Sequence, residues 1–307
     1  MIDVTLTGSA ALAPTPQRAL AAACAVCQGR GVLFDCGEGT QTAARKAGVS
    51  LMKADVIALT HYHGDHIFGL PGLMQTMSVL GRTTPLTIVG PAGIDAELAP
   101  IMTLTGRVGF DIRLTTLPPE GVALNSINEK WPAGARLTAF PTVHRVPSQG
   151  YCLTLDRPGA FLPEKARALG VPVKRWGLLQ RGQSVRVGEG VVTPDAVLGP
   201  PRSGLKLVFS GDTAACDSLA DAAKDADLLI CEATYAGDDQ AELAAEYGHM
   251  VFSQAADIAR RAGVRRLWLT HFSQMIEDPA AALPAATAIF PAAEVGEDGM
   301  KATLRFV

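Results

Sequence analysis

Three histidines and one aspartate stand close together in the chain, at His61, His63, Asp65 and His66. A neutral imidazole binds zinc through one ring nitrogen, and a carboxylate beside it can ligate a second ion or accept a proton. Chance seldom produces these four residue types at this spacing. The pattern His-x-His-x-Asp-His therefore predicts a metal site.

Four more candidate ligands lie where predicted strands or helices begin or end. His144 follows a strand-like segment at 136–143, His271 follows a predicted strand at 267–269, and His249 precedes a predicted helix. Asp212 stands between two small residues just after another predicted strand. Active sites are commonly built from side chains at such strand ends, so we expect these residues to join the metal site.

The elements that must position these residues can be read from short apolar runs that end abruptly in small polar residues. Such runs are typical of buried strands, and they occur at 32–34, 56–59, 205–209, 228–231 and 267–269. Helices are predicted at 251–262, ended by Gly263, and at 279–290, with Asp278 as the N-cap. The last residues, 294–307, are expected to turn through Asp298 and Gly299 into a closing hairpin strand. The predicted class is α/β.

Composition indicates a folded protein. Of the 307 residues, 48% are hydrophobic and 19% are charged, which excludes a disordered, collagen-like or low-complexity chain. No uncharged, proline-free apolar run approaches the ~18 to 20 residues that span a bilayer, so no membrane insertion is expected. The first residues lack a basic region, so we expect no signal peptide.

Six cysteines are scattered along the chain, unlike the dense framework of a small secreted domain. We therefore expect reduced thiols and a cytoplasmic location. The pair Cys24 and Cys27 has no second pair with the same spacing and lies in a strand-like run, so we interpret it as structural.

The charge is unevenly distributed. The formal net charge is −3, but residues 157–186 carry seven basic residues and one acidic residue, leaving 20 basic and 29 acidic residues elsewhere. Such a segment, punctuated by glycine and proline, favours a projecting arm that contacts phosphates. A solvated surface loop is the alternative, and Trp176 within it could stack on a base or pack a miniature core.

Together these motifs resemble the metallo-β-lactamase superfamily and, within it, the ribonuclease Z family of endonucleases that process the 3′ end of transfer RNA. The resemblance covers nearly the whole chain. It rests on residues 34–41, 60–66, 143–144, 210–213, 232–234, 248–249 and 269–273.

The resemblance implies an α/β fold, a four-layer αββα metallo-β-lactamase sandwich with a projecting basic arm. It implies a single hydrolase domain over residues 1–307, in which residues 157–204 form an inserted flexible arm that serves as the tRNA exosite.

The resemblance also implies two Zn²⁺ ions per subunit, with Mn²⁺ or another divalent ion as the alternative. One ion takes His61, His63 and His144, the other takes Asp65, His66 and His271, and Asp212 bridges them.

Two cations a few Å apart can clamp a phosphodiester and stabilise its transition state. Asp65 is the expected base. The resemblance implies that His249 is the proton donor and that Glu232 holds the other ring nitrogen of His249.

The implied activity is that of a zinc-dependent endoribonuclease. It removes the 3′ trailer of precursor tRNA at or near the discriminator nucleotide and leaves a 3′-hydroxyl. The implied partners are precursor tRNA and a second copy of the chain in a homodimer, with no DNA and no membrane. The expected RNA-binding arm residues are Arg157, Lys165, Arg167, Lys174, Arg175 and Arg181.

Two other classes of function remain open. One is a small-molecule phosphodiesterase or arylsulfatase of the same fold, which the basic arm disfavours because a small ester needs no distant positive surface. The other is a non-catalytic, zinc-bearing RNA-binding protein, which the full set of ligand types disfavours. Salt-dependent tRNA affinity would distinguish the tRNA endonuclease from a small-molecule hydrolase. Loss of turnover without loss of binding in Asp65→Ala would distinguish it from a non-catalytic RNA-binding protein.

Overall fold

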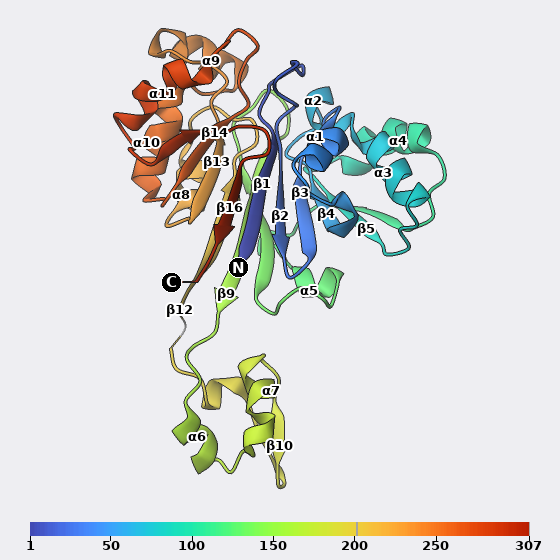
Figure 1. Ribbon diagram of the computed structural model, residues 1–307, viewed down its shortest axis with the longest axis vertical. Coiled ribbons are helices and arrows are strands. Elements are labelled where there is room, and N and C mark those ends of the chain that lie inside the picture. The colour runs from blue at the N-terminus through green and yellow to red at the C-terminus, as the bar shows by residue number, and fades with distance from the viewer. Residues whose placement is uncertain (201, 307) are drawn as a thin grey trace.

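Two seven-stranded sheets face each other, and helices cover their outer faces (Figure 1). The computed structural model describes residues 1–200 and 202–306. In spatial order the first sheet contains β16 (Lys301–Leu304), β1 (Ile2–Gly8), β2 (Ala22–Cys27), β3 (Arg30–Phe34), β4 (Ala54–Ala58), β5 (Leu86–Val89) and β6 (Ile112–Thr115). The second contains β15 (Ala293–Val295), β14 (Leu267–Thr270), β13 (Leu228–Glu232), β12 (Arg202–Phe209), β9 (Gln149–Arg157), β8 (Ala135–Pro141) and β7 (Val122–Ala123).

The helices lie in two outer layers. The first half of the chain contributes α1 (Thr40–Lys46), α2 (Gly64–Ile67), α3 (Leu70–Val79) and α4 (Ile94–Thr105), with a 3-10 turn at Leu51–Lys53. The short helix α5 (Leu124–Ile127) instead packs against the central core beside β7 and β8. The second half contributes α8 (Asp217–Ala223), α9 (Ala241–Tyr247), α10 (Phe252–Ala262) and α11 (Pro279–Thr287), with a 3-10 turn at Asp238–Gln240. This arrangement confirms the four-layer αββα sandwich expected from the sequence.

The layering follows from the alternation of side chains along each strand. In β13, Leu228 and Ile230 belong to the core between the two sheets, whereas Leu229 packs in a second core under the helices. Phe34 of β3 stacks on Phe209 of β12 across the central core, with ring centroids 5.3 Å apart. Successive side chains of a strand point to opposite faces, so strands covered on both sides must be apolar throughout. That is why they appear in the sequence as short unbroken apolar runs.

The five predicted strands are present, and so are the two predicted helices. Val251 is the N-cap of α10, and Gly263 ends that helix with a φ of 63°, a left-handed conformation that glycine adopts without strain. The Asp278 side chain accepts a hydrogen bond from the amide of Ala280 at the start of α11. That helix ends at Thr287, three residues before the predicted end.

The predicted closing hairpin is wrong. The turn is present, because the amide of Met300 donates to the carbonyl of Glu297. However, the strands on either side of it enter different sheets: β15 pairs with β14, and β16 pairs antiparallel with β1. The chain thus crosses between the sheets, and β16 covers the edge that β1 would otherwise expose.

The segment after β9 leaves the sandwich and returns at β12, and Figure 1 shows it projecting beyond one end of the sheets. It contains α6 (Pro163–Ala168), α7 (Trp176–Gln180), the ribbon β10 (Val185–Val187) and β11 (Gly190–Val192), and 3-10 turns at Val173–Arg175 and Pro194–Ala196. Five buried apolar residues form its own small core. Trp176 packs against Phe161 at 5.2 Å between ring centroids and donates to the carbonyl of Val171, so it serves this miniature core.

Cys24 and Cys27 point to opposite faces of the first sheet, since Cys24 lies in the core under the helices and Cys27 in the central core. Burial raises the pKa of the Cys24 thiol to about 12. The pair is therefore structural, as interpreted. Over the described residues, the structure contains no helix both long and apolar enough to cross a membrane.

Candidate metal centre and active site

The candidate ligands converge at one end of the two sheets. β3 runs parallel to β4, and β12, β13 and β14 run parallel to one another, so the loops after these strands open on the same side. The six histidines and the two aspartates Asp65 and Asp212 all come from this set of loops and from the loops after β8 and α9. In Figure 1 this is the end that carries α2.

The first cluster contains three imidazoles. Nε2 of His61 lies 2.9 Å from Nδ1 of His63, and Nε2 of His144 lies 3.3 Å from the same Nδ1. A zinc ion with Zn–N distances of about 2.0 to 2.1 Å in a tetrahedral site holds its ligand atoms roughly 3.3 Å apart. The distances between the ring nitrogens of these three histidines therefore fit a single cation.

Burial lowers the pKa of each histidine in the first cluster, and neighbouring imidazoles add to this effect. The three rings are therefore held in the neutral form that can donate a lone pair to a cation. Nδ1 of His144 donates to the carbonyl of Gly248 at 2.9 Å, which leaves its Nε2 with the free lone pair.

The second cluster contains Asp65, His66 and His271. Oδ2 of Asp65 lies 3.5 Å from Nε2 of His66 and 3.7 Å from Nε2 of His271. Both Nε2 atoms are buried, and neither has a hydrogen-bond partner among residues 1–200 and 202–306. Two orphaned imidazole nitrogens that face a carboxylate are what a cation site presents when its ligands are in place. The donor set thus fits a second divalent cation.

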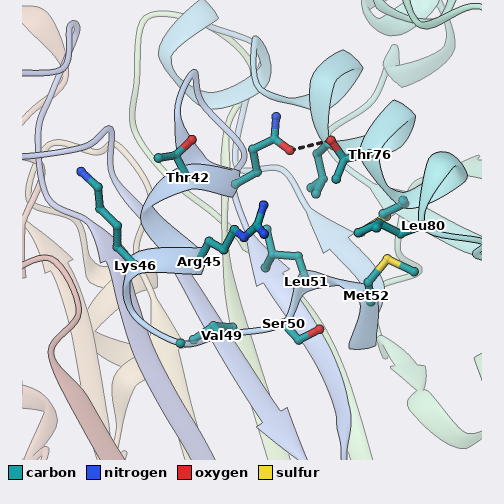
Figure 2. Close-up of a pocket in the computed structure, with 13 residues that line it drawn as sticks. Thr42, Arg45, Lys46, Val49, Ser50, Leu51, Met52, Thr76 and Leu80 are labelled. Carbon is teal, nitrogen blue, oxygen red and sulfur yellow. Dashed lines mark hydrogen bonds between the residues drawn. The ribbon is translucent and has the colours of Figure 1, made fainter.

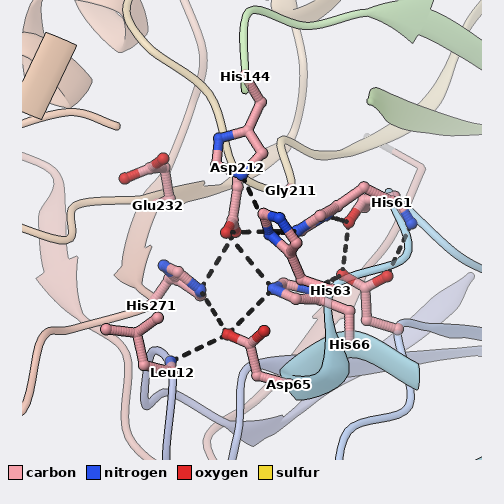
Figure 3. A network of polar contacts seen from close by, with 12 residues as sticks. Leu12, His61, His63, Asp65, His66, His144, Gly211, Asp212, Glu232 and His271 are labelled. Carbon is pink, nitrogen blue, oxygen red and sulfur yellow. Dashed lines mark hydrogen bonds and ion pairs between the residues drawn. The ribbon is translucent and has the colours of Figure 1, made fainter. Parts of the chain in front are cut away.

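Asp212 lies between the two clusters. Its carboxylate is 3.4 Å from Nε2 of His66, 3.2 Å from Nε2 of His271 and 3.8 Å from Nε2 of His61 (Figure 3). Burial alone would raise the pKa of this carboxyl, but His271 and His66 outweigh it and hold the pKa well below its usual range. An ionised carboxylate in this position can bridge two cations.

Asp65 also contacts the loop after β1. Its Oδ2 accepts a hydrogen bond of 2.9 Å from the amide of Leu12, which has a positive φ of 61° (Figure 3). Burial would raise the pKa of Asp65, but contacts with His271 and His66 hold it below its usual range. The carboxylate is therefore ionised at neutral pH.

Glu232 and His249 form a hydrogen-bonded pair beside the clusters. Nδ1 of His249 lies 2.8 Å from Oε1 of Glu232, and Glu232 is also held by the amides of Thr213, Thr234 and Met250. Burial would lower the pKa of His249, but the charge of Glu232 outweighs this effect and raises the pKa to about 9. The ring of His249 stacks on that of His271 at 5.5 Å, so it lies against the second cluster.

Gly211 allows Asp212 to approach. Its φ is 60°, and a Cβ at this position would lie 2.6 Å from side-chain atoms of Thr60. The loop after β12 and the loop after β4 therefore come closer than any other residue type would permit.

The structure brings all the predicted ligands together, along with Glu232 and His249, whereas the arm cations lie at the far end of the molecule. Figure 1 places α6, α7 and β10 opposite α2 along the long axis. Arg157 stacks on Phe306 and Arg167 on Trp176, and Arg175 donates to the carbonyl of Arg186. The other three predicted arm cations, Lys165, Lys174 and Arg181, are exposed.

Sequence reasoning assigned no role to three buried residues around the clusters. Asp35 accepts from Nδ1 of His66 at 2.8 Å, Thr60 contacts Nδ1 of His61 at 3.0 Å, and Thr234 contacts Nδ1 of His271 at 2.8 Å. In the sequence, each stands within three residues of the end of a predicted strand and inside one of the segments on which the resemblance rests.

A separate groove of about 850 Å³ runs between α1, residues 49–52 and α3 (Figure 2). Thr76 donates to Gln41 across it at 2.9 Å, and Leu51, Leu73 and Met77 are among the residues that line it. None of the candidate ligands lines this groove, so it is distinct from the metal centre.

Comparison with known proteins agrees with the fold. The model of the metallo-beta-lactamase superfamily matches residues 26–150, and a beta-lactamase superfamily domain matches residues 196–272. The two facing sheets and the paired clusters thus define a protein of the metallo-β-lactamase superfamily.

Closer relatives narrow the assignment. The chain is 39% identical over 307 residues to a ribonuclease Z of Agathobacter rectalis, with 100% of this chain and 99% of that protein covered. It is 40% identical over 301 residues to a ribonuclease Z of Methanothermobacter thermautotrophicus, with 98% and 96% covered. The crystal structure of the short form of human tRNase Z is similar at a TM-score of 0.67 and 27% identity, covering 99% of this chain and 100% of that one. The chain belongs to the ribonuclease Z family.

Proposed function

We propose that this protein is a zinc-dependent endoribonuclease that removes the 3′ trailer from precursor tRNA by phosphodiester hydrolysis. The cut falls at or near the discriminator nucleotide and leaves a tRNA 3′-hydroxyl. The observation that carries the proposal is the pair of ligand clusters joined by Asp212, with His249 beside them, in a chain that matches ribonuclease Z relatives over its full length. The superfamily assignment and these clusters support divalent metal binding.

We assign the ligands as follows. His61, His63 and His144 would hold one cation, and Asp65, His66 and His271 the other, with Asp212 shared between them. Five imidazoles and two carboxylates favour zinc over magnesium or calcium, which prefer all-oxygen sites, while Mn²⁺ remains the competing ion to test. When bound, two such cations would polarise the phosphodiester and acidify the attacking water.

His249 is the proposed proton donor to the leaving oxygen. Glu232 holds its Nδ1, so Nε2 is the ring atom left to face the substrate. A pKa raised to about 9 keeps the imidazole protonated at neutral pH, as a general acid requires. Glu232 acts through His249 and is a positioning residue.

Asp65 is the proposed partner of the attacking water. Its carboxylate is ionised and only partly buried, and the amide of Leu12 fixes the oxygen that faces the cluster. An ionised carboxylate in this position accepts a hydrogen bond from water and orients it. Its lowered pKa favours passing the proton on over keeping it.

The arm is the proposed tRNA exosite, inserted at residues 157–204 of a single hydrolase domain. The exposed cations Lys165, Lys174 and Arg181 would neutralise phosphates, which folded RNA presents over its whole surface. Arg157, Arg167 and Arg175 are partly engaged by Phe306, Trp176 and Arg186, so we expect them to orient the arm as well as contact RNA.

A homodimer is part of the proposal. The arm projects from the end of the sandwich opposite α2, so a tRNA bound at the metal centre is reached more readily by the arm of a second copy (Figure 1). A cytoplasmic location is also proposed, because all six cysteines are free thiols and five of them are buried.

The proposal is tested with purified protein, a 3′-extended precursor tRNA and a small phosphodiester such as bis(p-nitrophenyl) phosphate. We expect one cut in the precursor, abolished by a chelator and restored by zinc. We also expect the affinity for the precursor to fall steeply as the salt concentration rises. The affinity should also fall in a variant with Lys165, Lys174 and Arg181 changed to glutamate. If the precursor survives while the wild-type protein and the arm variant hydrolyse the small ester equally well, the protein would instead be a small-molecule phosphodiesterase.

A further inference from the structure

A buried threonine connects a carboxylate to a metal-ligating histidine in the first half of the chain. The hydroxyl of Thr60 donates to Oδ2 of Asp35 at 2.9 Å and lies 3.0 Å from Nδ1 of His61. Thr60 is fully buried, and its amide donates to the other oxygen of Asp35 at 2.7 Å. These contacts fix the hydroxyl in one orientation.

The second half of the chain repeats this arrangement with different residues. The hydroxyl of Thr234 donates to Oε2 of Glu232 at 2.8 Å and lies 2.8 Å from Nδ1 of His271. Thr234 is 3% exposed, and its amide also donates to Glu232, at 3.2 Å. In both halves the carboxylate, the threonine and the histidine stand at or just after the ends of neighbouring parallel strands, β3 and β4 in one case and β13 and β14 in the other.

Counting protons shows what each threonine does. A hydroxyl has one hydrogen, and a carboxylate can only accept, so that hydrogen is committed to Asp35 or Glu232. The hydroxyl oxygen must then accept from the imidazole, which places the ring proton on Nδ1. The lone pair is left on Nε2, which is the atom that His61 and His271 turn toward the clusters.

We propose that Thr60 and Thr234 are paired positioning residues, one for each cation, and that each selects the histidine tautomer that can bind metal. Thr60 acts on His61 in the first cluster, and Thr234 acts on His271 in the second. The inference rests on the proposed two-cation centre and adds an assignment of which residue supports which cation.

The two carboxylates also differ in a way that separates the roles of the threonines. Asp35 holds a second ligand, His66, through Nδ1 at 2.8 Å, whereas Glu232 holds the proposed proton donor His249 at the same distance. Loss of the Thr234 hydroxyl therefore disturbs one cation and the group beside the leaving oxygen. Loss of the Thr60 hydroxyl disturbs metal ligands alone.

The test measures zinc binding in buffered zinc solutions for the full-length protein and for Thr60→Val and Thr234→Val, which keep side-chain volume but remove the hydroxyl. Groups that hold a ligand in place typically contribute 10- to 100-fold to metal affinity, so we expect each variant to weaken one of two sites by about that factor. Anomalous diffraction at the zinc edge, from crystals at limiting zinc, then identifies the site. We expect Thr234→Val to empty the position beside His271 and Thr60→Val the position beside His61.

Three controls make the outcome decisive. Thr60→Ser and Thr234→Ser keep the hydroxyl and should restore binding, and Thr105→Val removes a buried hydroxyl of α4 that donates only to the carbonyl of Ile101. Alanine variants replace the valine variants if circular dichroism shows that these do not fold. Unchanged zinc affinity in both valine variants, or failure of serine to restore it, would overturn the inference while leaving the two-cation centre intact. Wild-type protein that binds no zinc would overturn the proposed function itself.

Discussion

At the scale of single residues, the site depends on strained backbone positions as well as on ligand types. Asp35 and His271 both have a φ of 58°, a region that residues with a side chain seldom adopt. Each directly follows a buried strand and has its side chain fixed by hydrogen bonds. Strain of this kind persists where the surrounding structure holds it, and here it turns the side chains back toward the clusters.

The pH dependence of cleavage should report the pair of His249 and Glu232. The raised pKa of His249 means that the imidazole is protonated below about pH 9 and loses its proton above it. A general acid is active when protonated, so activity should fall as the pH rises through about 9. In Glu232→Gln the charge that raises this pKa is gone, so the fall should move to lower pH. The measurement is kcat/KM for precursor cleavage as a function of pH.

Two variants serve as references for this pH profile. His249→Gln should lower kcat by roughly 10²- to 10⁴-fold and keep the bound metal, because this is the usual contribution of a general acid. Glu246→Gln, an exposed carboxylate of α9, should leave the profile unchanged. A profile that is identical in Glu232→Gln and wild type would refute the assignment of His249 as the acid.

The candidate histidine and aspartate ligands are the part of the site that could be predicted from sequence. His61, His63, Asp65 and His66 are close in the chain, and a short helix start places them together without help from the rest of the fold. Asp35 and Thr234 could not be assigned roles in this way. Their functions arise from contacts between loops that only the parallel pairing of strands brings together.

At the scale of elements, the loops after β4 and β12 depend on one glycine. Gly211→Ala should destabilise the protein by about 1 to 3 kcal/mol more than Gly81→Ala, because overpacking a dense site costs about that amount. Gly81 has the same left-handed backbone, with a φ of 82°, but open space around it. Urea unfolding of both variants measures the difference. Equal destabilisation would mean that the contact with Thr60 imposes no constraint.

The arm is an element with its own core, and this core can be weakened selectively. Leu179 is fully buried among the five residues of that core. Leu179→Ala should cost about 2 to 5 kcal/mol, which is more than so small a cluster can absorb, so the arm should unfold locally. Hydrogen exchange of residues 160–198 should then accelerate, and affinity for precursor tRNA should fall.

The matched control for the arm is Leu169→Ala, since Leu169 is 44% exposed. It should leave both hydrogen exchange and tRNA affinity near wild type. Hydrolysis of a small phosphodiester should be unchanged in both variants, because the sandwich holds the metal centre. If hydrogen exchange of the arm is unaltered in Leu179→Ala, the arm does not depend on its own core for stability.

The prediction of a closing hairpin failed for a physical reason. The strand at the C-terminus was visible in the sequence, but its partner was not, because the turn through Asp298 and Gly299 is equally compatible with a hairpin and a crossover. The crossover is favoured by contacts made elsewhere: Asp298 accepts from the hydroxyl of Ser9 and the amide of Ala19, which fixes the turn beside the first sheet.

At the scale of the whole molecule, the arm and the metal centre occupy opposite ends, so the proposed dimer can be tested by mixing. One chain carries His249→Gln, and the other carries the three arm cations changed to glutamate. If the arm of one copy serves the site of the other, half of the dimers in an equal mixture have one working site. Cleavage should then recover to about a quarter of the wild-type rate. Recovery no greater than the sum of the separate chains would show that each arm serves its own subunit, or that no dimer forms.

In the proposed reaction, water attacks the phosphorus at the junction of tRNA and trailer while His249 protonates the leaving 3′ oxygen of the tRNA. This reaction is tested by single-turnover cleavage of a 3′-extended precursor tRNA in ¹⁸O-labelled water, followed by mass spectrometry of both products. We expect a 3′-hydroxyl on the tRNA and one ¹⁸O atom in the 5′-phosphate of the trailer. A 2′,3′-cyclic phosphate or 3′-phosphate on the tRNA, with no label in the trailer, would contradict the proposed reaction.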